Sequence, residues 1–154
     1  MSVVILFGTE TGNAEGCAFE IGRVMGEVAP VDVHDMTDYS PQQLLDSRAD
    51  TVVVVTATHG EGELAGGGAR FFEALVGMSA RLEGVRFMVF GLGDSYYSTY
   101  NRASEIVVEH LSALGATQLG STFRHDASSG DDPEELAGEW AEEMRALVAA
   151  PVAS

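Results

Sequence analysis

Residues 2–14 read SVVILFGTETGNA. This sequence predicts a strand, then a turn, then the start of a helix, and that succession indicates the class of fold. The run 2–8 is almost continuously apolar and rich in β-branched residues, which is typical of a parallel strand covered on both faces. Glycines, threonines and an asparagine follow, the composition of a turn. Beyond the turn, a helix is predicted over 14–28, with apolar residues at helical spacing at Ala14, Ala18, Ile21, Met25 and Val28.

The alternation of strand and helix continues along the chain. Strands are predicted at 51–57 (TVVVVTA) and 85–91 (VRFMVFG), with weaker candidates at 30–34 and 116–123. Helices are predicted over 68–76, 99–114 and 133–148, with Gly115 ending the second and Asp132 and Pro133 starting the third. The predicted buried face of the last helix consists of Leu136, Trp140, Met144 and Leu147.

Strands that alternate with helices predict an α/β fold, a three-layer sandwich with a parallel sheet and right-handed crossovers. Five strands in a chain of this length fit the doubly wound order 2-1-3-4-5. We expect residues 1–150 to form a single domain, with 151–154 as a short tail and no room for a second catalytic domain.

The composition excludes several classes of function. The chain has 154 residues, of which 24 are Asp or Glu and 8 are basic, and its formal charge is −16. All the basic residues are arginines, so a lysine-dependent mechanism is impossible, and the scarcity of cations argues against nucleic acids and anionic membranes as partners. Cys17 is the single cysteine, and the first apolar run is too short for a signal or membrane segment. We therefore expect a cytoplasmic protein.

A doubly wound sheet binds its ligand outside the carboxyl ends of its strands, at the switch point between strands 1 and 3. That rule selects three loops, at 8–14, 57–66 and 92–101. The first offers hydroxyls, a glycine and backbone N–H groups at a helix start, without the lysine of a Walker A motif, and so suits a terminal monophosphate. A capped turn with no ligand explains the first loop alone equally well.

The other two loops suggest a planar ligand. The second places His59 and Glu61 among glycines, which suits close approach of the backbone to a ligand, although a flexible surface loop explains His59 alone. The third holds three tyrosines within five residues, of which one would stack on the ligand while the others pack against the scaffold. A phosphate site beside a stacking site implies FMN, the smallest common cofactor of that shape.

Three motifs carry a resemblance to a known family. Residues 3–15, VVILFGTETGNAE, resemble the phosphate loop of flavodoxins and of the FMN domains of diflavin reductases. TATHGEGE and FGLGDSYYSTYN resemble the two loops that flank the flavin ring in the same families. Short single-domain flavodoxins of the MioC type are similar as well, and the resemblance covers essentially the whole chain. It implies a flavodoxin-like fold, FMN as cofactor and no catalytic residue or metal site.

The resemblance also implies a role for individual residues. The FMN phosphate would lie against Thr9, Glu10, Thr11, Gly12, Asn13 and Ala14. The inner face of the ring would border Thr58, His59 and Gly60. Tyr97 would stack on the outer face, which Leu92, Gly93, Asp94, Tyr100 and Asn101 also line, and Asp126 would close the rim. Many relatives have Tyr or Trp in place of His59 and a proline near Leu64, where this chain continues with three glycines. That difference predicts a looser loop.

The resemblance implies a one-electron carrier rather than an enzyme. Its partners would be basic redox proteins, with an NAD(P)H-dependent flavodoxin reductase as donor and an unidentified acceptor. They would dock on an acidic rim made of Asp131, Asp132, Glu134, Glu135, Glu61 and Glu63, although a solvated helix end explains part of this cluster. Two alternatives stay open, an FMN-dependent NAD(P)H:quinone oxidoreductase and a flavodoxin-fold protein with a degenerate FMN site. A phospho-receiver domain would need a lysine near its last strand, which this chain lacks.

Overall fold

The computed structural model describes residues 2–8, 12–59, 63–64, 66–78, 81–93 and 102–149. The expected tail at 151–154 lies outside these residues. The strands are β1 (Val3–Phe7), β2 (Val31–Asp35), β3 (Thr51–His59), β4 (Glu63–Leu64), β5 (Arg86–Gly93), β6 (Thr117–Gln118) and β7 (Phe123–Asp126). The helices are α1 (Asn13–Met25), α2 (Pro41–Ser47), α3 (Gly68–Gly77), α4 (Arg102–Ala113) and α5 (Pro133–Ala149), with a short 3₁₀ turn at Ala127–Ser129.

The main sheet is parallel, with the order β2-β1-β3-β5-β6. β7 pairs with the second half of β5, whereas β6 pairs with the first half, so β6 and β7 together occupy the fifth position in the sheet. The predicted order 2-1-3-4-5 is therefore confirmed. The predicted continuous strand over 116–123 is wrong. Gly120, at φ 64°, interrupts it, because a left-handed residue does not continue a strand, and pairing resumes at Phe123.

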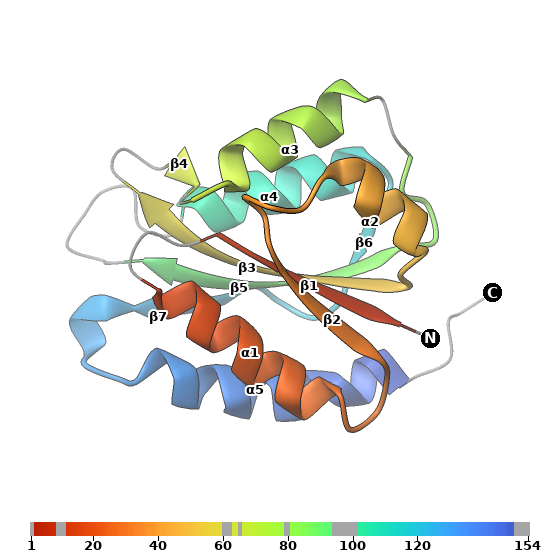
Figure 1. The fold of residues 1–154 in the computed structure, drawn as a ribbon. Coiled ribbons are helices and arrows are strands. Elements are labelled where there is room, and N and C mark those ends of the chain that lie inside the picture. The colour runs from red at the N-terminus through yellow and green to blue at the C-terminus, as the bar shows by residue number, and fades with distance from the viewer. Residues whose placement is uncertain are drawn as a thin grey trace.

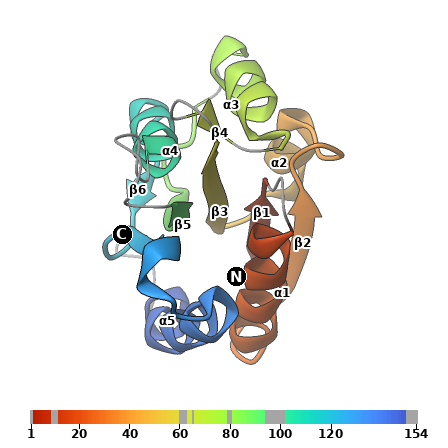
Figure 2. The ribbon, with the colours of Figure 1, turned by 90° about the vertical axis from the view of Figure 1, so that its left-hand side faces the viewer.

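Helices cover both faces of this sheet. Helices α2, α3 and α4 lie on one side and α1 and α5 on the other, as Figure 1 and the end-on view of Figure 2 show. The interior strands are buried on both faces, which explains their nearly continuous apolar sequence. The fold is therefore the predicted three-layer α/β sandwich.

Local signals explain the ends of several helices. Asp132 Oδ1 accepts a hydrogen bond from Glu134 N at 3.0 Å, confirming Asp132 as the cap of α5. Gly115 has φ 100° just after α4, confirming its predicted role at the end of that helix. Helix α2 was not predicted, although its capping box is visible in the sequence. Ser40 Oγ accepts from Gln43 N, and Gln43 Oε1 accepts from Ser40 N.

Two residues of the predicted helix faces are exposed. Val28 lies beyond the last residue of α1 and is 37% exposed, and Leu147 of α5 is 38% exposed. On α5 the buried face includes the small residues Ala137 and Ala141, together with Trp140, Met144 and Val148. The buried face of α5 is therefore rotated relative to the predicted one, because closely packed alanines, and not Leu147, complete it.

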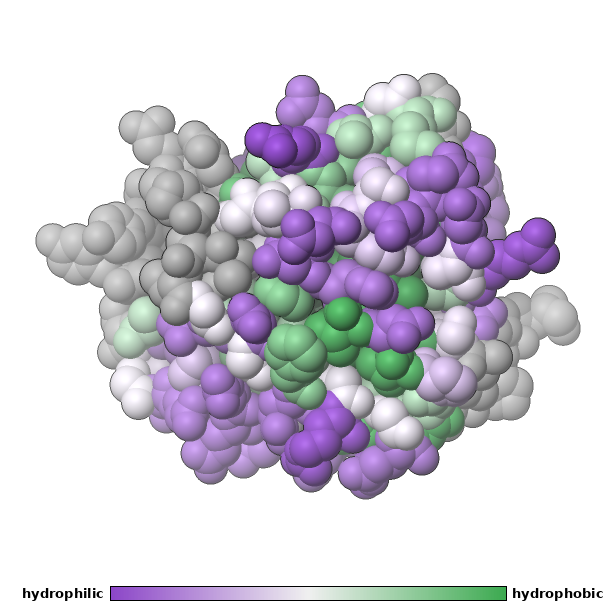
Figure 3. Space-filling model, viewed as in Figure 1, coloured by the Kyte–Doolittle hydropathy of each residue, from purple (hydrophilic) through white to green (hydrophobic). Residues whose placement is uncertain are grey.

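The side of the molecule that presents β2 and α1 is largely hydrophilic, around a narrow apolar strip (Figure 3). Within the described part of the sheet β2 is an outermost strand, and Asp32 at its second position is exposed. Among the described residues, no helix combines the length and apolar composition that a membrane span requires.

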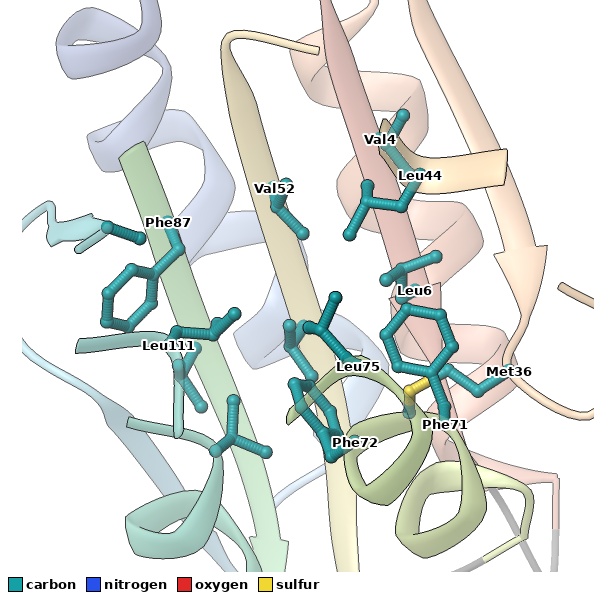
Figure 4. Close-up of a cluster of buried hydrophobic side chains, with 14 of the residues drawn as sticks. Val4, Leu6, Met36, Leu44, Val52, Phe71, Phe72, Leu75, Phe87 and Leu111 are labelled. Carbon is teal, nitrogen blue, oxygen red and sulfur yellow. The ribbon is translucent and has the colours of Figure 1, made fainter. Parts of the chain in front are cut away.

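Two apolar cores lie on the two faces of the sheet. The core under α2, α3 and α4 contains Phe71, Phe72 and Leu75 of α3, which point toward the strands in Figure 4. The core under α1 and α5 contains Phe90, which is stacked on Phe123 with ring centroids 4.8 Å apart. Both cores extend along the strands, so the ends of these strands are held on a rigid base.

Candidate functional site

The carboxyl ends of β1, β3, β5 and β7 meet at one edge of the sheet, the edge that faces the viewer in Figure 2. The register is continuous across this edge. Phe7 pairs with Val55, Ala57 with Leu92 and Gly93 with Asp126. The structure therefore brings the ends of the predicted ligand loops together, as the topology requires.

The first loop leaves β1 and ends at the N-terminus of α1. Gly8 N donates to Val55 O at 3.2 Å, which fixes the start of the loop against β3. At its other end Gly12 has φ 91° and precedes the helix, and a Cβ added to Gly12 would meet no atom of the described residues within 4 Å. Asn13 is exposed and Ala14 is buried. Thr9, Glu10 and Thr11 lie outside the described residues.

The backbone at the N-terminus of α1 makes this end of the helix suitable for an anion. The first N–H groups of a helix have no intrahelical acceptor, and the helix dipole adds partial positive charge there. Gly12 brings no side chain into the space above the helix end. The arrangement suits an oxyanion such as a monophosphate, bound by backbone groups rather than by a cationic side chain.

The second loop begins as a hairpin. The backbones of Thr58 and His59 pair in antiparallel fashion with Leu64 and Glu63. Gly60, the rest of the connection 60–62 and the side chains of Thr58 and His59 lie outside what the structure describes.

The predicted loose loop after Gly60 falls largely outside the described residues, and the described residues that follow it are packed. Leu64 is 8% exposed and belongs to the core under α3. A Cβ on Gly67 would lie 2.5 Å from Thr37 N, and Gly68 is buried against Leu64 and Met36. Gly67 and Gly68 therefore permit close packing of α3 on the neighbouring turn.

The third loop follows β5. Leu92 is 7% exposed and Gly93 ends the strand, where it pairs with Asp126 of β7. The other residues predicted here, Asp94, Tyr97, Tyr100 and Asn101, lie outside the described residues.

The connection from β7 to α5 closes the other side of the edge. Asp126 is partly exposed, and its carbonyl accepts a hydrogen bond of 2.7 Å from Ser129 Oγ. His125 is 5% exposed, and its Nε2 lies 2.9 Å from Asp131 O. His125 is not among the predicted site residues, because the sequence carries no signal that separates it from a surface histidine in a polar strand.

Acidic residues surround the start of α5. Asp131, Asp132, Glu134 and Glu135, four residues of the predicted acidic rim, are all exposed. Glu134 reaches across to α1, where its carboxylate occupies the space beside Gly16. The rim therefore adjoins the N-terminus of α1. Glu61 lies outside the described residues, as does the side chain of Glu63.

The same carboxylates affect Cys17, on the next turn of α1. Burial, together with the smaller effect of the nearby charges of Glu134 and Asp132, raises the pKa of the Cys17 thiol to about 12. Cys17 is therefore an inert, protonated core residue.

Within the described part of the chain, no three His, Cys, Asp or Glu side chains gather so that they could hold a metal ion.

Comparison with known proteins gives one family. The family model described as flavodoxin matches residues 5–140. The chain is 34% identical over 142 residues to the sulfite reductase [NADPH] flavoprotein alpha-component of Bacillus subtilis, covering 91% of this chain and 22% of that protein. It is also 34% identical over 142 residues to NADPH-dependent diflavin oxidoreductase 1 of Yarrowia lipolytica, covering 90% and 20%. The chain thus spans about a fifth of the length of these relatives.

Solved structures of single-domain proteins are similar over nearly their full length. A cysteine variant of flavodoxin from Pseudomonas aeruginosa superposes with a TM-score of 0.88 at 29% identity, covering 97% of this chain and 100% of that one. Oxidised flavodoxin 1 from Bacillus cereus superposes with a TM-score of 0.81 at 26% identity, covering 95% of each chain.

Proposed function

The chain belongs to the flavodoxin family, and from that premise we propose that it carries single electrons between two protein partners, with FMN as its redox group. The observation that carries the proposal is geometric. The glycine-capped start of α1, the β3–β4 hairpin and the ends of β5 and β7 meet at one sheet edge. This is the edge at which a doubly wound fold binds its ligand.

FMN is the cofactor of the family, and the described residues fit it. The exposed, left-handed Gly12 precedes the first N–H groups of α1, and such groups suit a phosphate in a chain that has no lysine. Leu92 and Gly93 add an apolar strand end on the side where the ring would lie. When bound, FMN supplies one-electron redox chemistry, and the protein supplies orientation and electrostatics.

We assign the cofactor contacts as follows. Thr9, Glu10, Thr11, Gly12, Asn13 and Ala14 hold the phosphate. Thr58, His59 and Gly60 border one face of the ring, and Tyr97 covers the other, with Leu92, Gly93, Asp94, Tyr100 and Asn101 along that side. Asp126 closes the rim. The side chains of these residues orient the ring and exclude water from it; none needs to exchange a proton with a substrate.

Partner binding would be electrostatic. The exposed carboxylates from Asp131 to Glu135 adjoin the start of α1, and the stretch 126–144 contains no basic residue. A basic partner would therefore dock beside the cofactor edge, where electron transfer needs a short path. The NADPH named in two relatives supports an NAD(P)H-dependent reductase as the donor.

The test is an anaerobic potentiometric titration of the FMN-loaded protein. We expect two separate one-electron midpoint potentials, and rates of reduction by a flavodoxin reductase that fall as salt rises. A single two-electron step would contradict the carrier role. Direct oxidation of NAD(P)H without a reductase would favour the quinone oxidoreductase instead, and failure to bind FMN would establish a degenerate site.

A further inference from the structure

The turn that follows β2, residues 35–38, contacts the end of β1 on one side and the start of α3 on the other. Met36 N donates to Phe7 O at 2.9 Å, so the turn is bonded to the last residue of β1. Phe7 directly precedes the loop that leads to Gly12. The position of the turn is therefore fixed relative to the start of the proposed phosphate site.

The opposite side of the turn contacts the start of α3. A Cβ on Gly67 would lie 2.5 Å from Thr37 N and 2.6 Å from Thr37 Cα. Both are backbone atoms, which cannot rotate away as the end of a side chain could. Gly67 also caps α3, since Phe71 N donates to Gly67 O at 3.0 Å. The helix thus begins in direct contact with the turn, and only a glycine permits that distance.

The contact continues into the β3–β4 hairpin. Leu64 pairs with Thr58 through the backbone, and its side chain is buried in the core under α3. Leu64 and Met36 both pack where a Cβ on Gly68 would lie, with Leu64 Cβ at 3.0 Å and Met36 Cε at 3.4 Å from that position. Figure 4 shows Met36 between β1 and α3, with its sulfur toward Phe71. The turn, α3 and the hairpin form one packed unit.

A side chain holds the turn itself in shape. Asp35 Oδ1 accepts a hydrogen bond of 2.8 Å from Thr37 N, and Asp38 N donates to Asp35 O at 3.0 Å. This is a turn in which the aspartate side chain replaces a backbone acceptor. Loss of the Asp35 carboxylate would free the N–H of the residue that contacts Gly67.

We propose that the turn 35–38 is a positioning element for the cofactor: it fixes the hairpin beside the flavin ring relative to the loop that holds the phosphate. Asp35 and Gly67 are the positioning residues, although neither is among the expected FMN contacts. The inference rests on the proposed binding of FMN at this edge. A rigid connection of this kind preorganises both halves of a ligand site and so strengthens binding.

Five variants test the proposal: two substitutions, a control for each and one conservative replacement. Gly67→Ala places a methyl group against Thr37, and Gly77→Ala is its control at the other end of α3, because a Cβ on Gly77 meets no atom of the described residues within 4 Å. Asp35→Ala removes the acceptor in the turn, and Asp32→Ala removes an equal charge from the same strand. Asp35→Asn keeps an acceptor oxygen and loses the charge, so it should restore binding if the hydrogen bond is what matters.

The measurements are the FMN dissociation constant, from quenching of FMN fluorescence, the midpoint potentials of the loaded proteins and the melting temperature of each apoprotein. We expect Gly67→Ala and Asp35→Ala to raise the dissociation constant by about tenfold or more and to shift the potentials. Asp35→Asn and both controls should stay within about twofold of wild type.

The outcomes separate the two proposals. Variants that melt earlier but keep the wild-type dissociation constant and potentials would show a structural role only and overturn the inference. If Gly67→Ala does not fold, the comparison of Asp35→Ala with Asp35→Asn decides. Wild-type protein that fails to bind FMN would overturn the proposed function together with the inference, whereas FMN binding that is equal in all variants would overturn the inference alone.

Discussion

The imidazole of His125 and the carbonyl of Asp131 lie in hydrogen-bond contact, with Nε2 2.9 Å from the oxygen. A carbonyl oxygen only accepts, so Nε2 carries the proton in this contact. The bond joins the two ends of the connection between β7 and α5. Asp126, at the edge of the proposed cofactor site, belongs to the segment between them. The buried His125 side chain of β7 thereby fixes the backbone just before α5, where the acidic rim lies.

Replacement of His125 by Ala should lower the free energy of unfolding by about 1–3 kcal/mol, because the Asp131 carbonyl loses its donor and removal of the buried imidazole leaves a cavity. Urea titration measures the loss. Because its side-chain amide can donate to the same carbonyl, His125→Gln should recover part of the loss. Equal stability of the Ala and Gln variants would show that the bond contributes nothing.

Thr51 offers the opposite case, a polar atom whose removal should cost little. The residue is fully buried, and its Oγ1 has no hydrogen-bond partner in the part of the chain that the structure describes. Thr51→Val keeps the shape and removes the unpaired hydroxyl, so stability should stay equal or rise by up to about 1 kcal/mol. Thr117→Val, at an exposed strand position, is the control. A loss above about 1 kcal/mol for Thr51→Val would reveal a bonded hydroxyl.

The raised pKa of Cys17 predicts alkaline destabilisation. Burial holds the folded-state pKa at about 12, above the ordinary value of 9.0. The folded protein therefore keeps a proton that the unfolded chain releases, and the associated stability is complete below pH 9 and lost as pH rises toward 12. The slope approaches about 1.4 kcal/mol per pH unit.

The comparison that isolates this effect is with Cys17→Ala. Unfolding free energies of both proteins, measured between pH 8 and the onset of alkaline denaturation, should converge as pH rises, because tyrosines and arginines titrate alike in both. A constant difference across that range would contradict the buried, protonated thiol.

Trp140 should be the largest single contributor on α5. It is the only tryptophan of the chain, is 6% exposed and meets Phe90 edge-on with ring centroids 5.5 Å apart. Trp140→Ala should cost about 3–5 kcal/mol in chemical denaturation followed by circular dichroism. Leu147→Ala on the same helix should cost less than about 1 kcal/mol, since Leu147 is exposed. A larger loss at Leu147 would restore the helix face predicted from the sequence.

The sequence predicted the order of the main sheet because each interior strand is a compact β-branched run. It failed at the edges. The interruption at Gly120 depends on a left-handed backbone and on Met144, which lies against that glycine, and neither is visible in local composition. The predicted faces of α1 and α5 included Val28 and Leu147, because spacing alone cannot show where a helix ends or which alanines pack.

The candidate site was predictable as a set of loops, since strand ends and the switch point follow from the topology. The contacts that support the site were not. The approach of Gly67 to Thr37 joins residues distant in the sequence, and only the packed structure shows that Gly67 and Gly68 serve close contact. His125 likewise became noticeable only through its burial and its bond to Asp131.

The position of β2 as an outermost strand of the described sheet has a consequence for handling the protein. Such a strand is a template for pairing with another molecule, and we expect the exposed Asp32 and the charge of −16 to keep copies apart. That protection is electrostatic, so it disappears as the carboxylates take up protons near the isoelectric point of about 4.3. Solutions held above neutrality should stay clear, whereas acidification toward that value should produce turbidity that starts at this strand.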